Sequence, residues 1–132
     1  MKNGTGMTVR ELIGGEVVWI DQADSMRQAV QLMVGSDIGA LAVEFDGRIE
    51  GIITERDVLG ACNDDLDLDA TPVSRCMTSS PDTLEPDMSV DDAADWLLAA
   101  GYRHLPVVDE GQILGMVSIK DILWALAAPT RA

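Results

Sequence analysis

The chain has 132 residues, of which 47% are apolar and 4% aromatic, and its formal net charge is −14 at pH 7. A chain of this length forms at most one ordinary domain, or two very small ones packed as a unit, and its apolar content suffices for a core. The negative charge argues against nucleic acid and anionic membrane surfaces as partners, because both repel an acidic protein.

The sequence has neither a long apolar segment nor a secretory signal. Its longest apolar run, residues 122–128, is far shorter than the roughly 20 residues that cross a bilayer. No basic stretch followed by an apolar one opens the chain, so we expect a soluble, cytoplasmic protein. Cys62 and Cys76 form no metal-binding pattern. A disulfide between them is the alternative to free thiols, which a reducing cytoplasm favours.

The sequence repeats itself at a spacing of 64 residues. Residues 8–59 align with residues 72–123 without a gap, and ten of the 52 positions are identical. Such a repeat predicts one structural unit used twice, with each copy covering the apolar face of the other. The predicted segments are an N-terminal tail (1–7), repeat 1 (8–62), an acidic linker (63–71), repeat 2 (72–127) and a C-terminal tail (128–132).

Both copies predict the same elements in chain order, because capping-box spacings, helical apolar faces and a turn pair recur. The first copy is expected to hold a helical turn (Val9–Ile13), a strand (Val17–Ile20), a helix from Ser25 to Gly35, a hairpin (40–54) turning at Asp46-Gly47, and a helix (Glu55–Ala61). The second is expected to hold a turn (Val73–Met77), a strand (Asp82–Leu84), a helix from Ser89 to Gly101, a hairpin (104–118) and a helix (Ile119–Ala127). The predicted fold class is α+β, with two β-α-β-β-α repeats.

The linker carries four aspartates, at positions 64, 65, 67 and 69. Alternating carboxylates resemble a Ca²⁺ loop, but Ala70 stands where such a loop needs glycine, and Cys76 where it needs glutamate. A solvated acidic linker is the favoured interpretation.

A polar motif recurs at the end of each hairpin. A hydroxyl residue stands three places before an aspartate, and a basic residue directly precedes that aspartate; the residues are Thr54, Arg56 and Asp57, and then Ser118, Lys120 and Asp121. The simpler explanation is that each aspartate complements a helix N-terminus. The functional one is that hydroxyl and carboxylate hold the adjacent hydroxyls of a ribose, while the basic residue and the free helix N–H groups receive phosphate.

The region from about residue 8 to 127 resembles a tandem pair of cystathionine-β-synthase (CBS) domains, also called a Bateman module. The resemblance rests on GIITERD (51–57) and GMVSIKD (115–121), which match the family pattern G-h-h-S/T-x-x-D, and on IGALAV (38–43) and YRHLPVV (102–108). The segment SRCMTSSPDTLEPDMSV, from residue 74, is similar to the start of a second copy.

The resemblance implies two copies packed about a pseudo-two-fold axis, with two clefts between them that hold adenosine compounds such as AMP, ADP, ATP, NAD(H) or S-adenosylmethionine. The implied ribose-binding residues are Thr54, Asp57, Ser118 and Asp121. The implied phosphate-binding residues are Arg56, Arg103, His104 and Lys120. Base binding, mainly by backbone, is implied near Val18, Ile38, Asp82 and Tyr102. Copy one has Gly39 and Ala40 where copy two has Arg103 and His104, so we expect unequal sites.

We therefore expect a regulatory adenine-nucleotide sensor that changes shape on binding, forms a homodimer and acts on an unknown effector protein. No catalytic residues, metal ligands or required cofactor are expected, and the sole histidine, His104, lacks partners for catalysis in the sequence. The alternatives are a structural dimerisation module without a ligand, and a sensor of S-adenosylmethionine or NAD(H).

Overall fold

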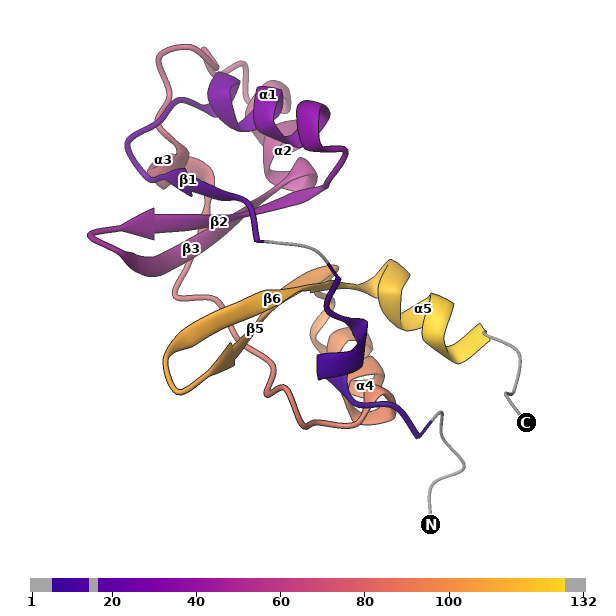
Figure 1. The fold of residues 1–132 in the computed structure, drawn as a ribbon. Coiled ribbons are helices and arrows are strands. Elements are labelled where there is room, and N and C mark those ends of the chain that lie inside the picture. The colour runs from indigo at the N-terminus through magenta and orange to yellow at the C-terminus, as the bar shows by residue number, and fades with distance from the viewer. Residues whose placement is uncertain (1–5, 15–16, 128–132) are drawn as a thin grey trace. The chain divides into compact units, whose positions relative to one another are not determined.

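The computed structural model describes residues 6–14 and 17–127. The chain divides into two compact units. Residues 17–81 form the first-repeat unit, and the N-terminal residues together with those from 82 onward form the second-repeat unit. Each unit combines paired strands with packed helices (Figure 1), which confirms the predicted α+β class. The predicted tails at 1–7 and 128–132 lie outside the described residues, except for residues 6 and 7.

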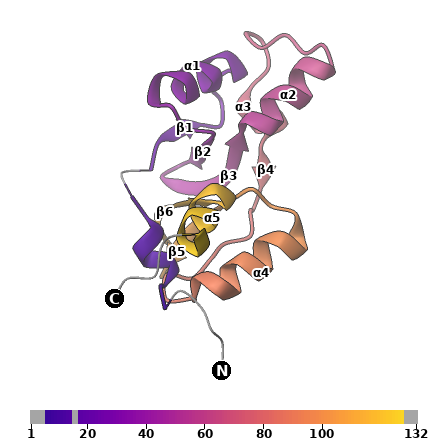
Figure 2. The ribbon, with the colours of Figure 1, turned by 90° about the vertical axis from the view of Figure 1, so that its right-hand side faces the viewer.

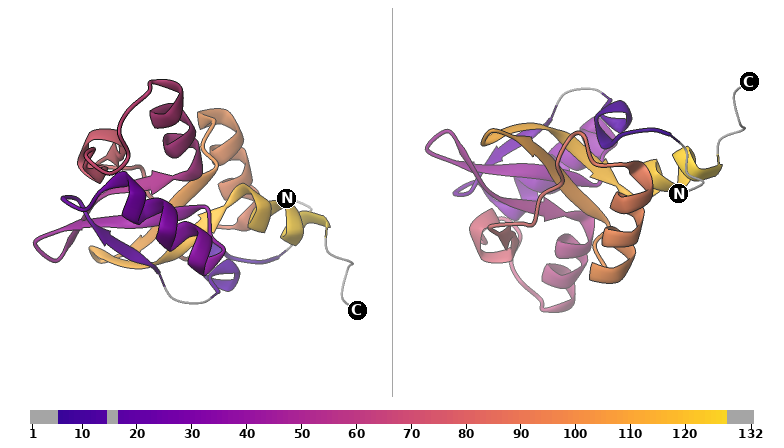
Figure 3. Two further views of the ribbon diagram at one scale, coloured as in Figure 1. Left: turned by 90° about the horizontal axis from the view of Figure 1, so that it is seen from above. Right: turned by 90° about the horizontal axis from the view of Figure 1, so that it is seen from below.

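The first-repeat unit contains a four-stranded sheet in the order β1-β2-β3-β4. Strand β1 runs parallel to β2, whereas β2–β3 and β3–β4 are antiparallel pairs. Helices α1 and α2 lie on one face of this sheet, and α1 crosses over it in the view from above (Figure 3). The elements are β1 (Trp19–Asp21), α1 (Met26–Ser36), β2 (Ala40–Phe45), β3 (Arg48–Thr54), α2 (Glu55–Asn63), α3 (Val73–Cys76) and β4 (Thr78–Ser79).

The apolar pattern of the sequence explains this unit. Leu41, Val43 and Ile53 are completely buried in the middle of the sheet, and Met26 and Ala29 meet them from one face of α1. Burying a side chain of this size contributes roughly 1.5–3 kcal/mol. The hairpin turns at Asp46 and Gly47, whose φ angles of 54° and 77° are those of a two-residue turn that matches strand twist.

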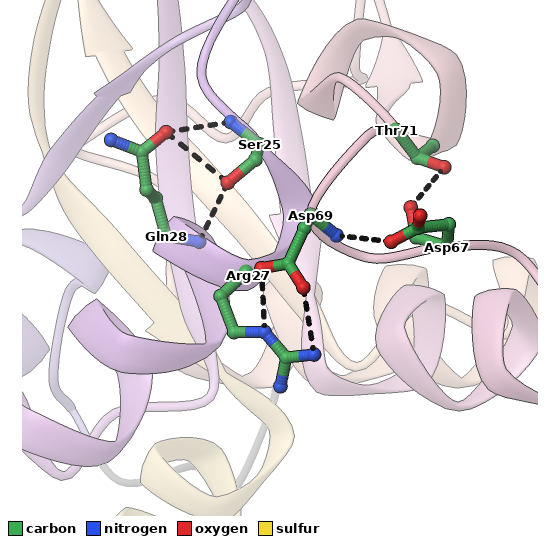
Figure 4. A network of polar contacts seen from close by, with 6 residues as sticks. All are labelled: Ser25, Arg27, Gln28, Asp67, Asp69 and Thr71. Carbon is green, nitrogen blue, oxygen red and sulfur yellow. Dashed lines mark hydrogen bonds and ion pairs between the residues drawn. The ribbon is translucent and has the colours of Figure 1, made fainter.

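Helix α1 begins at the predicted capping box. The backbone N–H of Gln28 donates to Ser25 Oγ at 3.1 Å, and the N–H of Ser25 donates to Gln28 Oε1 at 2.8 Å (Figure 4). The predicted end at Gly35 was wrong, because the helix continues through Ser36 and Asp37 adopts the left-handed cap with φ 53°. Aspartate tolerates this conformation better than most residues, so glycine is not required there.

The acidic segment between the repeats is tied to the first-repeat unit. Arg27 Nε donates to Asp69 Oδ1 at 3.0 Å, and the Asp67 carbonyl accepts from Thr71 Oγ1 at 2.7 Å (Figure 4). Leu66 and Leu68 pack against the buried core. The segment is therefore an ordered connection with solvated carboxylates, held by its apolar residues and one exposed ion pair.

The second-repeat unit is built on the antiparallel hairpin β5–β6. The turn residues Glu110 and Gly111, with φ angles of 50° and 79°, repeat the geometry of the first hairpin. The strand predicted at Asp82–Leu84 is reduced to one parallel bridge between Leu84 and Val107. The elements are η1 (Val9–Leu12), α4 (Val90–Ala100), β5 (His104–Asp109), β6 (Gln112–Ser118) and α5 (Ile119–Ala127).

The leading helical turn of each copy packs in the unit formed by the other copy. Turn η1, which lies beside β5–β6 and α5 (Figure 2), buries Val9 in the second-repeat core and donates from the Val9 N–H to the Met88 carbonyl at 2.9 Å. Turn α3 correspondingly buries Val73 in the first-repeat core. Glycine permits both approaches: Gly115 faces Ile13, and Gly51 faces the Thr78 carbonyl.

Candidate functional site

The first motif forms the corner between β3 and α2, here called corner one. Thr54 ends β3 and caps α2, because its Oγ1 accepts from the Asp57 N–H at 3.3 Å. Asp57 Oδ2 in turn accepts from the Thr54 N–H at 2.8 Å and from Thr54 Oγ1 at 3.0 Å. Both residues are half-buried, so water screens these charge-assisted bonds only in part.

The second motif forms the same corner between β6 and α5, here called corner two. Asp121 Oδ2 accepts from the Ser118 N–H at 2.9 Å and from Ser118 Oγ at 3.0 Å. Ser118 Oγ accepts from the Asp121 N–H at 3.1 Å. The two corners therefore contain the same three hydrogen bonds between equivalent residues of the repeat.

These bonds are a capping box, which by itself explains the spacing of hydroxyl and aspartate. The simpler explanation given for the motif aspartates therefore accounts for the motif hydroxyls as well. The box uses only Oδ2 of Asp57 and of Asp121. It also fixes each carboxylate in one orientation, with Oδ1 left outside the box as an acceptor.

The basic residues predicted for phosphate gather mainly at corner two. The Ile119 N–H donates to the Arg103 carbonyl at 2.8 Å, which places residue 103 directly beside the start of α5. His104 is the cross-strand partner of Ser118, and Lys120 is exposed in the first turn of α5. At corner one, Arg56 holds the position of Lys120 and is also exposed.

The four residues predicted for base binding already make hydrogen bonds within the protein, two through their backbone and two through their side chains. The carbonyl of Val18 accepts from the Ala42 N–H at 3.0 Å, and the N–H of Ile38 donates to the Met33 carbonyl at 3.0 Å, so these backbone groups already serve the fold. The other two predicted residues, Asp82 and Tyr102, contact one another through their side chains.

Asp82 and Tyr102 are joined by a hydrogen bond from the tyrosine hydroxyl to Asp82 Oδ2 at 2.6 Å. This bond, more than burial, raises the pKa of Tyr102 above its ordinary value, because the carboxylate favours the protonated phenol. The ring of Trp96 stacks on Tyr102 with centroids 5.6 Å apart and planes 14° from parallel. Asp82 and Trp96 thus hold the ring of Tyr102, which lies two residues before the start of β5.

A further residue at corner one is Glu55, which directly follows the motif hydroxyl and was not predicted from the sequence. Its N–H donates to the Gly39 carbonyl at 3.0 Å, and its carboxylate lies over Gly39. A Cβ placed on residue 39 would lie 3.0 Å from Glu55 Oε1. The signal in the sequence was the contrast with Ile119, the apolar residue at the same position of copy two.

Other kinds of site are not indicated in the part of the chain that the structure describes. Across residues 6–14 and 17–127, no group of three or more His, Cys, Asp or Glu side chains is arranged to hold a metal ion. Among the same residues, no helix has the length and apolarity needed to span a bilayer.

Comparison with known proteins identifies the family. Residues 9–64 and 73–128 each match the model of the CBS domain, so the chain belongs to the CBS-domain family as a tandem pair. An uncharacterized 17.7 kDa protein of Acidianus ambivalens is 38% identical over 105 residues, covering 77% of this chain and 62% of that protein. The chain therefore spans about three fifths of that relative.

Solved structures share the fold. A protein with CBS domains from Burkholderia ambifaria has a TM-score of 0.89 at 30% identity, covering 96% of this chain and 98% of that one. A CBS domain pair crystallised with 5′-methylthioadenosine and S-adenosyl-L-methionine has a TM-score of 0.80 at 23% identity, covering 89% and 93% of the two chains. At that identity the second likeness shows the fold alone.

Proposed function

We propose that this CBS pair is a regulatory module that binds adenosine-containing ligands at its two corners and passes a change of shape to an effector protein. The observation that carries the proposal is the duplicated pair of hydroxyl residue and aspartate, joined by the same three hydrogen bonds beside a basic residue at two helix N-termini. A capping box alone does not require the neighbouring Arg56 and Lys120.

The geometry suits a ribose. With Oδ2 committed to the box, Oδ1 of Asp57 or Asp121 is the oxygen that would accept from the ribose hydroxyls. A 5′-phosphate would be attracted by the positive end of the helix dipole, together with the side chains of Lys120 and Arg103 at corner two. The hydrogen bond from Ile119 to the Arg103 carbonyl supports this grouping.

The adenine-nucleotide class, AMP, ADP or ATP, is the ligand we propose, with S-adenosylmethionine or NAD(H) as the alternative. A structure with the same fold was solved with two adenosyl compounds, which supports the adenosine class as a whole. The role is regulatory and not enzymatic, and a cytoplasmic location is part of the proposal. A ligand changes the shape only if it binds one conformation more tightly than another.

Calorimetric titration with AMP, ADP, ATP, NADH and S-adenosylmethionine tests the proposal, using wild type, Asp57→Asn and Asp121→Asn. Asparagine keeps an oxygen for the capping box but replaces the second carboxylate oxygen by an N–H₂ donor. Each variant should keep its melting temperature and lose roughly fivefold to a hundredfold in affinity at its own corner. No binding of any compound to folded, nucleotide-free wild type would reject the proposal.

A structural dimerisation module is the second candidate, favoured by the apolar surface of the second-repeat helices. Leu98 on α4 and Leu123 and Trp124 on α5 are 71%, 58% and 60% exposed. We propose that this face forms the homodimer. Sedimentation equilibrium of Trp124→Ser should show a weaker dimer than wild type, and a dimer that assembles without any ligand response would favour this second candidate.

A further inference from the structure

The two corners share their hydrogen bonds and differ in the side chain that follows the motif hydroxyl. Corner one has Glu55 at this position, whereas corner two has Ile119. In both corners the backbone N–H of this residue donates to the residue before the second strand, Gly39 in one case and Arg103 in the other. The backbone hydrogen bonds at the two corners are therefore equivalent, so the side chains of Glu55 and Ile119 can be compared directly.

At corner one, the glutamate occupies the space beside residue 39. A Cβ on Gly39 would lie 3.0 Å from Oε1 and 3.1 Å from Cδ of Glu55. The lack of a side chain at Gly39 is what lets the carboxylate lie there. At corner two, the equivalent position carries Arg103, and the neighbouring Ile119 has no charge.

The charges beside the two motif carboxylates are therefore opposite. Corner one sets Glu55 and Asp57 against the single cation Arg56. At the same positions, corner two has one carboxylate, Asp121, and two cations, Lys120 and Arg103. The net charge of these positions is therefore negative at corner one and positive at corner two, so a phosphate group at the helix start is disfavoured at the first and favoured at the second.

We propose that Glu55 is a specificity determinant, so that corner one selects an adenosine ligand whose 5′ substituent is neutral or cationic, while corner two takes the anionic 5′-phosphate. This inference rests on the proposed function, because it assigns a ligand class to each of the two proposed sites. It also predicts that one chain senses two adenosine compounds of different charge.

Glu55 also favours helix formation, because an acidic residue in the first turn complements the helix dipole. That structural role is separable from ligand selection. Glu55→Gln keeps the size of the side chain and removes its charge, so it acts on a charged ligand more strongly than on a neutral one. Its melting temperature reports the structural effect alone.

The test uses the full chain with binding at one corner weakened, and three probes: AMP, adenosine and 5′-amino-5′-deoxyadenosine, which carries a cation at the 5′ position. In the Asp121→Asn background, corner one should bind adenosine and the amine more tightly than AMP. Adding Glu55→Gln should raise the affinity for AMP relative to adenosine roughly threefold to tenfold and lower that for the amine by a similar ratio. Both shifts should shrink as salt is added.

The matched control adds a glutamate at the equivalent position of corner two. In the Asp57→Asn background, Ile119→Glu should lower the affinity of corner two for AMP relative to adenosine by the same range, roughly threefold to tenfold. Ratios that stay the same in both pairs, with ligand clearly bound, would overturn the role of Glu55 and leave the proposed function standing. Binding of none of the three probes to wild type, Asp57→Asn or Asp121→Asn would overturn the proposed function and this inference together.

Discussion

Replacing Gly115 by alanine tests how the N-terminal segment docks in the second-repeat unit. Gly115 is buried in β6, and a Cβ there would overlap Cγ2 of Ile13 and lie 3.1 Å from its Cγ1. Because Ile13 also packs against the buried core, it has little room to move away. Overpacking of this kind costs about 1–3 kcal/mol, which is the loss of unfolding free energy that we expect for Gly115→Ala.

A double-variant cycle isolates the contact. Ile13→Ala removes both clashing carbons and costs about 1–2 kcal/mol, since the side chain is half-buried. In the double variant the new methyl group fills the vacated space, because the remaining Cβ of Ile13 would be 3.3 Å away. The combined loss should therefore be smaller than the sum of the single losses by about 1–2 kcal/mol.

Urea unfolding followed by circular dichroism measures each term of the cycle. Gly51→Ala is the control, because its Cβ would lie 2.5 Å from the Thr78 carbonyl oxygen, and no side-chain truncation removes that backbone clash. Strictly additive losses for Gly115 and Ile13 would refute the docking of the N-terminal segment in this unit, as would a loss below about 0.5 kcal/mol for Gly115→Ala.

Three further predictions follow from the described contacts. Tyr102, the only tyrosine, should show a pKa above the ordinary value near 10 when its absorbance at 295 nm is followed with pH. Asp82→Asn should return the pKa of Tyr102 toward the ordinary value. The stability that the Tyr102–Asp82 bond contributes is fully present below the ordinary pKa and is lost as pH rises through the raised pKa. A thiol reagent should modify exposed Cys62 well before Cys76, whose pKa is raised by burial; equal rates would contradict this. Ser25→Ala should cost about 1 kcal/mol in urea unfolding, and an unchanged midpoint would contradict its capping role.

Much of the fold follows from local chemistry that the sequence displays. The Asp46-Gly47 turn places both hairpin strands in register, and the Ser25 box sets the start of α1. The helix after each hairpin begins where predicted because the motif hydroxyl is its N-cap. Short-range signals of this kind involve residues only a few positions apart, so one sequence is enough to find them.

The exchange of the leading turns could not be predicted in the same way. Val9 and Val73 carry the same apolar signal, which shows that each turn is buried but not in which core. The choice depends on hydrogen bonds to residues far along the chain, such as that from Val9 to Met88. Gly51 and Gly115 matched the family pattern, and only the structure shows the close approaches that need them.

The sequence shows which residue types recur at the candidate site, whereas the structure shows how they contact one another. The hydroxyl and aspartate of each motif do meet, but as partners in a capping box. The placement of Glu55 over Gly39 depends on how the start of α2 packs against the connection between α1 and β2, which spacing alone does not reveal.

Ligand binding at the two corners is tested by a ¹H–¹⁵N correlation spectrum of the full chain titrated with adenosine and, separately, with AMP. If the corners are the ligand sites, the largest amide shifts should fall at residues 54–57 and 118–121, with AMP acting mainly on the second group. Shifts that avoid both corners, or spectra that do not change at millimolar ligand, would contradict ligand binding at the corners.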